Sequence, residues 1–148
     1  MTDLNTTLTT TWEGLTHGNG RIKSSTMDLT IAIPQTYGGT GEGSHPKELL
    51  MASAASCYVM TFAGMPDARK LPLAGMTVYS ALSDMHKQGM YIVHDVRIVL
   101  SADAAQDRVQ AAEALIAAAD KACMVGNLLK TAGVQISVSG TVTIAPRD

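Results

Sequence analysis

Two cysteines in a chain of 148 residues are the first candidates for chemistry. Cys57 lies in "HPKELLMASAASCYVM" (45–60) and Cys123 in "DKACMVGNLL" (120–129), and both stretches have a helical, mostly apolar pattern. A free cysteine is among the most buried residue types and often serves only for packing. Two cysteines on crossing helices can also form a redox pair, because a sulfenic acid at one thiol condenses with the other to give a disulfide. Both interpretations stay open at this point.

A cysteine reacts as its thiolate, which forms at neutral pH beside a cation or a helix N-terminus. Three basic residues could supply a cation near Cys57, namely His17, Arg21 and Lys47. Such a cation would lower the thiol pKa below the ~8.5 of a free cysteine, whereas burial among small residues would raise it. Lys47 precedes Cys57 by ten residues, about 15 Å along one helix, so its ammonium would have to come from a partner chain or by a bent approach. Each basic residue is also consistent with an ordinary solvated position.

The composition predicts one ordinary globular domain over residues 1–148. Hydrophobic residues make up 46% of the chain and charged residues 16%, with a net charge of −2. Fewer charges than usual suggest that part of the surface is covered, for instance by an identical partner. The absence of a basic run argues against nucleic acid as a partner, and no apolar stretch approaches the length of a membrane span. The polar N-terminus lacks a signal-peptide pattern, so we expect a cytoplasmic protein with reduced thiols.

The local patterns predict an α+β fold with the order βββ-α-ββ-α-β. A helix should begin at Pro46, with His45 as its N-cap, and run to about Gly64. A second helix should begin after an N-cap at Ser101 and continue past Cys123 as a turn or short helix broken near Gly126. Its expected apolar stripe consists of Val109, Ala112, Leu115, Ile116 and Ala119. The expected strands are "TTLTTTWEG", "GRIKSS", "MDLTIAIP", then a hairpin of "AGMTVYSALSDM" and "MYIVHDVRIVLS" around "HKQG", and last "VQISVSGTVTIA".

This arrangement resembles the OsmC/Ohr family of organic hydroperoxide reductases over nearly the whole chain. The resemblance rests on "WEG", the glycine-rich loop "QTYGGTGEGSHP", the helix ending in "KAC", and above all the spacing of 11 from Pro46 to Cys57 on an alanine-rich helix. Family members typically have "NPEELxxAAxAAC" there. The resemblance implies an intertwined homodimer, in which two central helices pack on shared antiparallel sheets and two sites lie at the dimer interface.

The resemblance also implies roles for individual residues. Cys57 corresponds to the peroxidatic cysteine and Cys123 to the resolving cysteine, although Met124 stands where the family usually has a proline. The position of the family's catalytic glutamate falls on Lys47, with Glu48 one residue later. The position of its catalytic arginine falls on His17, with Arg21 four residues further on. Lys47, Glu48, His17 and Arg21 are therefore the candidate activating residues.

The implied function is a thiol-dependent peroxidase with an antioxidant role in oxidative stress. It would reduce organic hydroperoxides through the Cys57/Cys123 pair, with no metal or organic cofactor, and a dithiol of the lipoyl type would regenerate it. The changed activating residues are also consistent with a divergent member of weak activity. One alternative is a non-catalytic dimer that binds a small apolar molecule. Another is a structural dimer in which both cysteines only pack.

Overall fold

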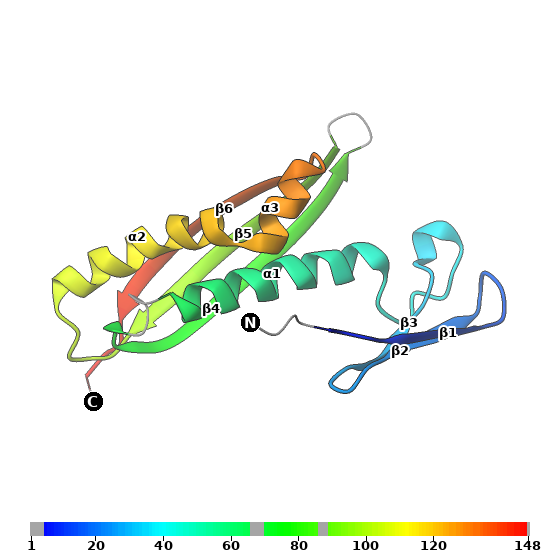
Figure 1. The fold of residues 1–148 in the computed structure, drawn as a ribbon, viewed down its shortest axis with the longest axis horizontal. Helices are drawn as coiled ribbons and strands as arrows, with labels where there is room; N and C mark the ends of the chain where they lie inside the picture. Colours follow the sequence, from blue (N-terminus) through cyan, green and yellow to red (C-terminus); the bar gives the residue numbers. More distant parts are fainter. Residues whose placement is uncertain (1–4, 66–69, 86–88, 148) are drawn as a thin grey trace. The chain divides into compact units, whose positions relative to one another are not determined.

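The computed structural model describes residues 5–65, 70–85 and 89–147. The chain is α+β, and its elements follow the predicted order with one helix added before the last strand (Figure 1). The elements are β1 (Thr9–Glu13), β2 (Asn19–Lys23), β3 (Asp28–Ile31), the 3-10 turn η1 (Gln35–Tyr37), α1 (Pro46–Gly64), β4 (Leu73–Met85), β5 (Gly89–Leu100), α2 (Gln106–Ala122), α3 (Met124–Thr131) and β6 (Gln135–Ile144). The predicted turn "HKQG" falls mostly on 86–88, outside the described residues. Two compact units, 1–49 and 50–148, are described separately below.

The first unit is built on a three-stranded antiparallel sheet in the order β1-β2-β3. Gly20 sits in the middle strand, paired with Trp12 on one side and Ile31 on the other. A side chain at Gly20 would collide with the Thr11 carbonyl oxygen and the Trp12 indole. This glycine therefore leaves room for the Trp12 ring beside the middle strand.

The second unit is built on a sheet in the order β4-β5-β6. β4 and β5 are antiparallel, as the hairpin pattern predicts, with a bulge between Leu73 and Gly75. β6 pairs parallel to β5, from Tyr91 opposite Gln135 to Leu100 opposite Ile144. The fold class is confirmed, but the expectation of purely antiparallel sheets is wrong in this detail. The reason is the connection: α2 and α3 carry the chain back to the starting end of β5, and such a helical crossover joins parallel strands.

One face of this sheet carries the core of the second unit. Side chains of β5 alternate between the two faces, as expected for a half-buried strand. The predicted stripe of α2 is buried at all five positions, which confirms it. α1 adds two fully buried aromatic rings, Tyr58 and Phe62. The inward residues of β5 are Ile92, His94, Val96, Ile98 and Leu100.

Two predicted helix boundaries are wrong. α2 begins at Gln106 with Ala105 as its N-cap, not at Ser101. Ser101 instead donates from its hydroxyl and its backbone N–H to the Pro72 carbonyl, at 2.8 and 2.7 Å, so its side chain is not available as a cap. The break after α2 lies at Cys123, whose extended backbone (φ −70°, ψ 110°) ends one helix and begins the next, while Gly126 lies inside α3.

Candidate redox site

The two cysteines meet in the second unit. Cys57 is half-buried on α1, and Cys123 is buried at the joint between α2 and α3. Both pack in the same hydrophobic cluster, and each thiol shifts the pKa of the other. The expectation that two helical cysteines could share one crossing therefore holds geometrically. Their roles in a reaction remain a proposal.

The start of α3 and the next turn of α1 place hydrogen-bonding groups beside the Cys57 sulfur. The backbone N–H of Val125 donates to Cys57 Sγ at 3.4 Å. The Thr61 hydroxyl, one turn further along α1, lies 4.0 Å from the same sulfur. The first N–H groups of a helix have no partner within the helix and carry its positive dipole end. The sulfur therefore occupies a position that favours negative charge.

The Cys57 pKa reflects two opposing influences. Burial, the largest influence, raises the pKa of the thiol. The Val125 N–H opposes it most strongly, helped by the Cys123 thiol, the Thr61 hydroxyl and the Met124 N–H. The net pKa of Cys57 lies below its ordinary value, so these hydrogen-bond donors do together what the sequence analysis expected from a cation.

Cys123 has the opposite balance. Burial raises the pKa of its thiol, and the Gly126 N–H only partly offsets this. The neighbouring Cys57 sulfur and the Asp120 carboxylate raise the pKa of Cys123 further. A Cβ at Gly126 would lie 3.3 Å from the Cys123 sulfur, so this glycine leaves room for a tightly packed thiol. Of the pair, Cys57 is the thiol set up to ionise first.

The four candidate activating residues lie in the first unit, and their role stays a prediction. Arg21, on β2, pairs with Asp28 of β3 at 2.8 Å, and both side chains are about half exposed. His17 is exposed in the turn between β1 and β2. Lys47 and Glu48 stand in the first turn of α1, ten and nine residues before Cys57.

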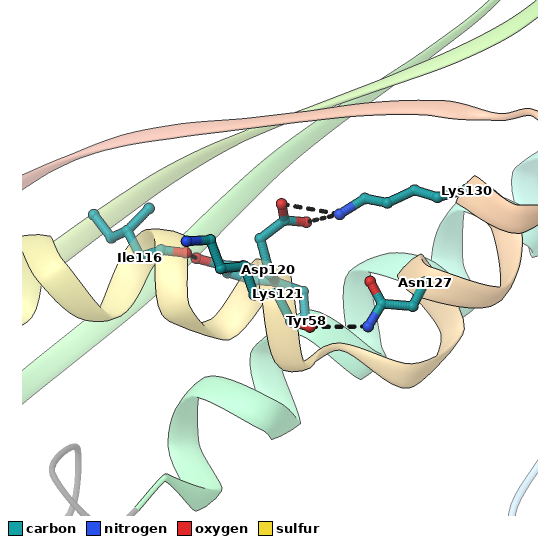
Figure 2. Close-up of polar contacts among 6 residues, drawn as sticks. All are labelled: Tyr58, Ile116, Asp120, Lys121, Asn127 and Lys130. Carbon is teal, nitrogen blue, oxygen red and sulfur yellow. Dashed lines mark hydrogen bonds and ion pairs between the residues drawn. The ribbon is translucent and has the colours of Figure 1, made fainter.

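A network of polar contacts ties the three helices of the second unit together (Figure 2). The Tyr58 hydroxyl on α1 donates to the Ile116 carbonyl of α2 at 2.8 Å. Lys130 of α3 contacts both carboxylate oxygens of Asp120 at 3.0 Å. The Asn127 side-chain amide donates to the Lys121 carbonyl at 2.9 Å.

A buried histidine lies beside this network. Ser80 Oγ lies 2.7 Å from His94 Nδ1, and the imidazole stacks on the Tyr58 ring with the centroids 5.9 Å apart. Burial lowers the pKa of His94, although the Asp120 carboxylate acts in the opposite sense. His94 is therefore a neutral core residue at ordinary pH. Its strand alternation predicts that it faces inward, but no local pattern identifies its serine and tyrosine partners.

The decisive group that the sequence analysis missed is a backbone amide. Val125 has an ordinary apolar side chain, and its N–H cannot be recognised from residue type. The available signal was a helix beginning directly after Cys123, since a helix N-terminus is a known alternative to a cation.

Three further observations concern small ligands, metal ions and membranes. In the first unit an apolar hollow of about 290 Å³ is lined chiefly by Trp12, Ile22, Ile31, Ile33, Pro34 and Leu49. Across the described ranges, no three His, Cys, Asp or Glu side chains group together in a way that could hold a metal ion. Helices in the same ranges are also too short or too polar to cross a membrane.

Comparison with known proteins agrees with this architecture. The sequence profile of the OsmC-like protein family matches residues 39–139. The uncharacterized protein YmaD of Bacillus subtilis (strain 168) is 30% identical over 148 residues, covering 97% of this chain and 98% of YmaD.

Two solved structures share the fold. One is a Legionella pneumophila protein described as an organic hydroperoxide resistance protein OsmC and predicted redox protein, with a TM-score of 0.67, 21% identity and coverage of 94% of this chain and 99% of that one. Another, an OsmC-like protein from Mycoplasma pneumoniae, gives a TM-score of 0.72 at 17% identity, with coverage of 96% and 99%. The family match, the relative over its full length and the shared α+β fold lead to one conclusion: the chain belongs to the OsmC-like protein family.

Proposed function

We propose that the chain is a thiol-dependent peroxidase that reduces organic hydroperoxides. The observation that carries this proposal is the half-buried Cys57 sulfur, which accepts the Val125 N–H at the start of α3 beside a second thiol. A lowered pKa increases the fraction of reactive thiolate at neutral pH. The description of the Legionella relative as an organic hydroperoxide resistance protein supports the choice of substrate class.

The proposed reaction uses both sulfurs in order. The Cys57 thiolate attacks the terminal oxygen of the hydroperoxide and the O–O bond breaks, which makes Cys57 a sulfenic acid. The alkoxide that leaves takes a proton from solvent and becomes the alcohol. The Cys123 thiol then attacks the oxidised sulfur, so that an S–S bond forms and water leaves. A dithiol reductant, of lipoyl type by family resemblance, reduces the disulfide by two thiol–disulfide exchanges. This chemistry suits a reducing compartment such as the cytoplasm.

We also propose that two copies form the working unit, as an intertwined homodimer. Three large apolar side chains close in sequence to the two cysteines are exposed in the single chain: Met60 (72%), Met124 (76%) and Leu128 (67%). Large apolar side chains of this kind would be buried if a second copy covered them, which supports the dimer proposal. An obligate dimer would show a melting temperature that depends on protein concentration, whereas a monomeric mass at micromolar concentration together with a concentration-independent melt would contradict the proposal.

The experiment compares hydroperoxide consumption by the wild type with a dithiol present and by the pre-reduced Cys57→Ser and Cys123→Ser variants after the dithiol has been removed. Cys57→Ser should lose consumption entirely. Cys123→Ser should consume about one equivalent and keep a sulfenic acid on Cys57 that a sulfenic-acid probe traps, since no thiol remains to condense with it. If the probe labels Cys123 in the Cys57→Ser protein, the two roles are reversed.

A second candidate is a non-catalytic small-molecule-binding protein, which the apolar hollow of the first unit favours. Clefts that bind small ligands are mostly apolar. Native mass spectrometry distinguishes the candidates. A co-purifying apolar molecule, together with no hydroperoxide consumption by the wild type, would favour binding over catalysis.

A further inference from the structure

We propose that Asn127, Asp120 and Lys130 form a clamp across the joint between α2 and α3, and that this clamp positions the start of α3 on the Cys57 sulfur. This inference rests on the proposed function, because it concerns how the Val125 N–H is held at the thiol that is proposed to react. In this scheme the three residues are positioning residues, which act on Cys57 through the backbone of α3.

Two contacts make up the clamp, and both cross the joint (Figure 2). Lys130 Nζ lies 3.0 Å from each oxygen of the Asp120 carboxylate. Their side chains are only 33% and 23% exposed, so the pair is better shielded than a free surface ion pair. Asn127 Nδ2 donates to the Lys121 carbonyl at 2.9 Å, one of the carbonyls at the end of α2 that lack a partner within the helix.

The joint needs such a clamp because its backbone alone does not fix α3. Cys123 is extended, so the hydrogen-bond ladder of α2 is interrupted before α3 begins. α3 has eight residues, and a helix that short is not stable by itself in water. A change in its direction would move the Val125 N–H away from Cys57 Sγ, which now lies at 3.4 Å. The two contacts limit this change from the α2 side.

Asn127→Ala tests the inference without changing any charge. Asn127 is exposed on α3, and alanine favours a helix more than asparagine does, so the variant should stay folded. The matched control is Thr131→Ala, because the Thr131 hydroxyl donates to the Asn127 carbonyl, a contact that stays within α3. The rate of Cys57 alkylation, followed across pH by peptide mass spectrometry, gives the thiol pKa in each protein.

We expect Asn127→Ala to raise the Cys57 pKa by about one unit, which lowers the alkylation rate at neutral pH about tenfold. Thr131→Ala should leave the pKa unchanged. A purely structural role for Asn127 would lower the melting temperature without moving this pH profile.

The ion pair is tested by a second set of variants. Lys130→Met alone would leave an unpaired negative charge on Asp120 near the thiols. The double variant Asp120→Asn/Lys130→Met removes the ion pair without leaving that charge, so any change in the Cys57 pKa reports the position of α3. The Cys57 pKa should be higher in the double variant than in the wild type. The single variant Lys130→Arg keeps the ion pair with Asp120, so its Cys57 pKa should equal that of the wild type. Lys121→Met is the matched control, because it removes a lysine at the same joint whose side chain is exposed.

The outcomes distinguish this inference from the proposed function. If folded Asn127→Ala and the folded double variant both keep the wild-type Cys57 pKa, the clamp is overturned even if the wild type consumes hydroperoxide. If both variants raise the pKa while the wild type consumes none, the clamp stands and the peroxidase proposal fails.

Discussion

The starts of α1 and α3 differ in how their free N–H groups are used. α1 begins with Pro46, has Lys47 and Glu48 in its first turn, and is capped by His45, whose Nδ1 accepts the Glu48 N–H at 3.4 Å. α3 begins with Met124 and has no acidic residue in its first turn, and its N-cap, Cys123, makes no side-chain cap. Instead, one of its N–H groups donates to a sulfur on another helix.

The difference places a donor to Cys57 Sγ at the less conspicuous of the two helix starts. The first turn of α1 has the charged side chains that suggest an active site, yet its cap is satisfied locally. The first turn of α3 has no charged side chain, but its Val125 N–H donates to Cys57 Sγ. Backbone donors give a thiolate the stabilisation that a cation would give, and they do so without a second titrating group.

The largest expected effect is the contrast in reactivity between the two sulfurs. At neutral pH, Cys57 in the reduced protein should be alkylated at least about tenfold faster than Cys123, because one pKa is lowered and the other raised. The Cys57 rate should rise with pH and reach half of its maximum at a lower pH than the rate of an ordinary thiol does. Peptide mass spectrometry of a time course measures both rates. Equal rates would mean that the donors at the start of α3 do not make Cys57 more reactive than Cys123.

Removing the principal donor should have the next largest effect. Val125→Pro deletes the N–H that reaches Cys57, and proline is tolerated in the first turn of a helix. A hydrogen bond to a charged group is worth about 1.5–3 kcal/mol, so the Cys57 pKa should rise by about one unit or more. The control is Val125→Ala, which keeps the N–H and should keep the pH profile. Identical profiles for Val125→Pro and Val125→Ala would rule out the amide as the activator.

A smaller effect on the Cys57 pKa is expected when α3, like α1, begins with a proline. In Met124→Pro, the extended backbone of Cys123 suits the residue before a proline. Met124 is 76% exposed within its own chain, so little packing inside the chain is lost, and Met124→Ala accounts for any contact that the side chain makes with a partner. Denaturant unfolding should show a gain of about 0.4–1 kcal/mol, because proline restricts the unfolded chain. The Cys57 pKa should rise less than in Val125→Pro, because the Met124 N–H contributes less. A loss of stability relative to Met124→Ala would mean that α3 does not begin at this residue.

The smallest effect is expected at the start of α1. Lys47 lies about 15 Å from Cys57 along the helix, beyond the screening length of about 8 Å in physiological salt. Lys47→Ala and Glu48→Gln should therefore leave the alkylation rate of Cys57 within about twofold of the wild type. If Lys47→Ala slowed alkylation as much as Val125→Pro does, the reactive helix start would be that of α1, and the comparison would be reversed.

Much of the fold could be predicted because its patterns are local. The buried stripe of α2, the start of α1 at Pro46 and the β4–β5 pair follow from periodicity, proline placement and alternation. The start of α2 could not be predicted, because Ser101 resembles an N-cap but bonds to Pro72, which lies far away in sequence. The parallel pairing of β6 likewise depends on the path of the helices and not on the strand's own residues.

The candidate site divides in the same way. The two cysteines could be predicted from residue type and helical pattern. The donors on Cys57 could not, because a backbone N–H has no sequence signature and because position 125 meets position 57 only through tertiary packing. The ion pair of Arg21 with Asp28 on the next strand could not be predicted from residue type either, and the activating role of Arg21 stays a prediction.

The parallel pairing of β5 and β6 has a consequence for how the chain is made. β4 and β5 are consecutive antiparallel strands, and such local pairs form within about 1–10 μs. β6 can join only after the intervening helices have been placed, and contacts between distant segments form late in folding. The Val125 N–H belongs to that late segment, so a chain emerging from the ribosome carries Cys57 as an ordinary thiol. The lowered pKa of Cys57 is therefore a property of the completed fold and not of the residues next to Cys57 in the sequence.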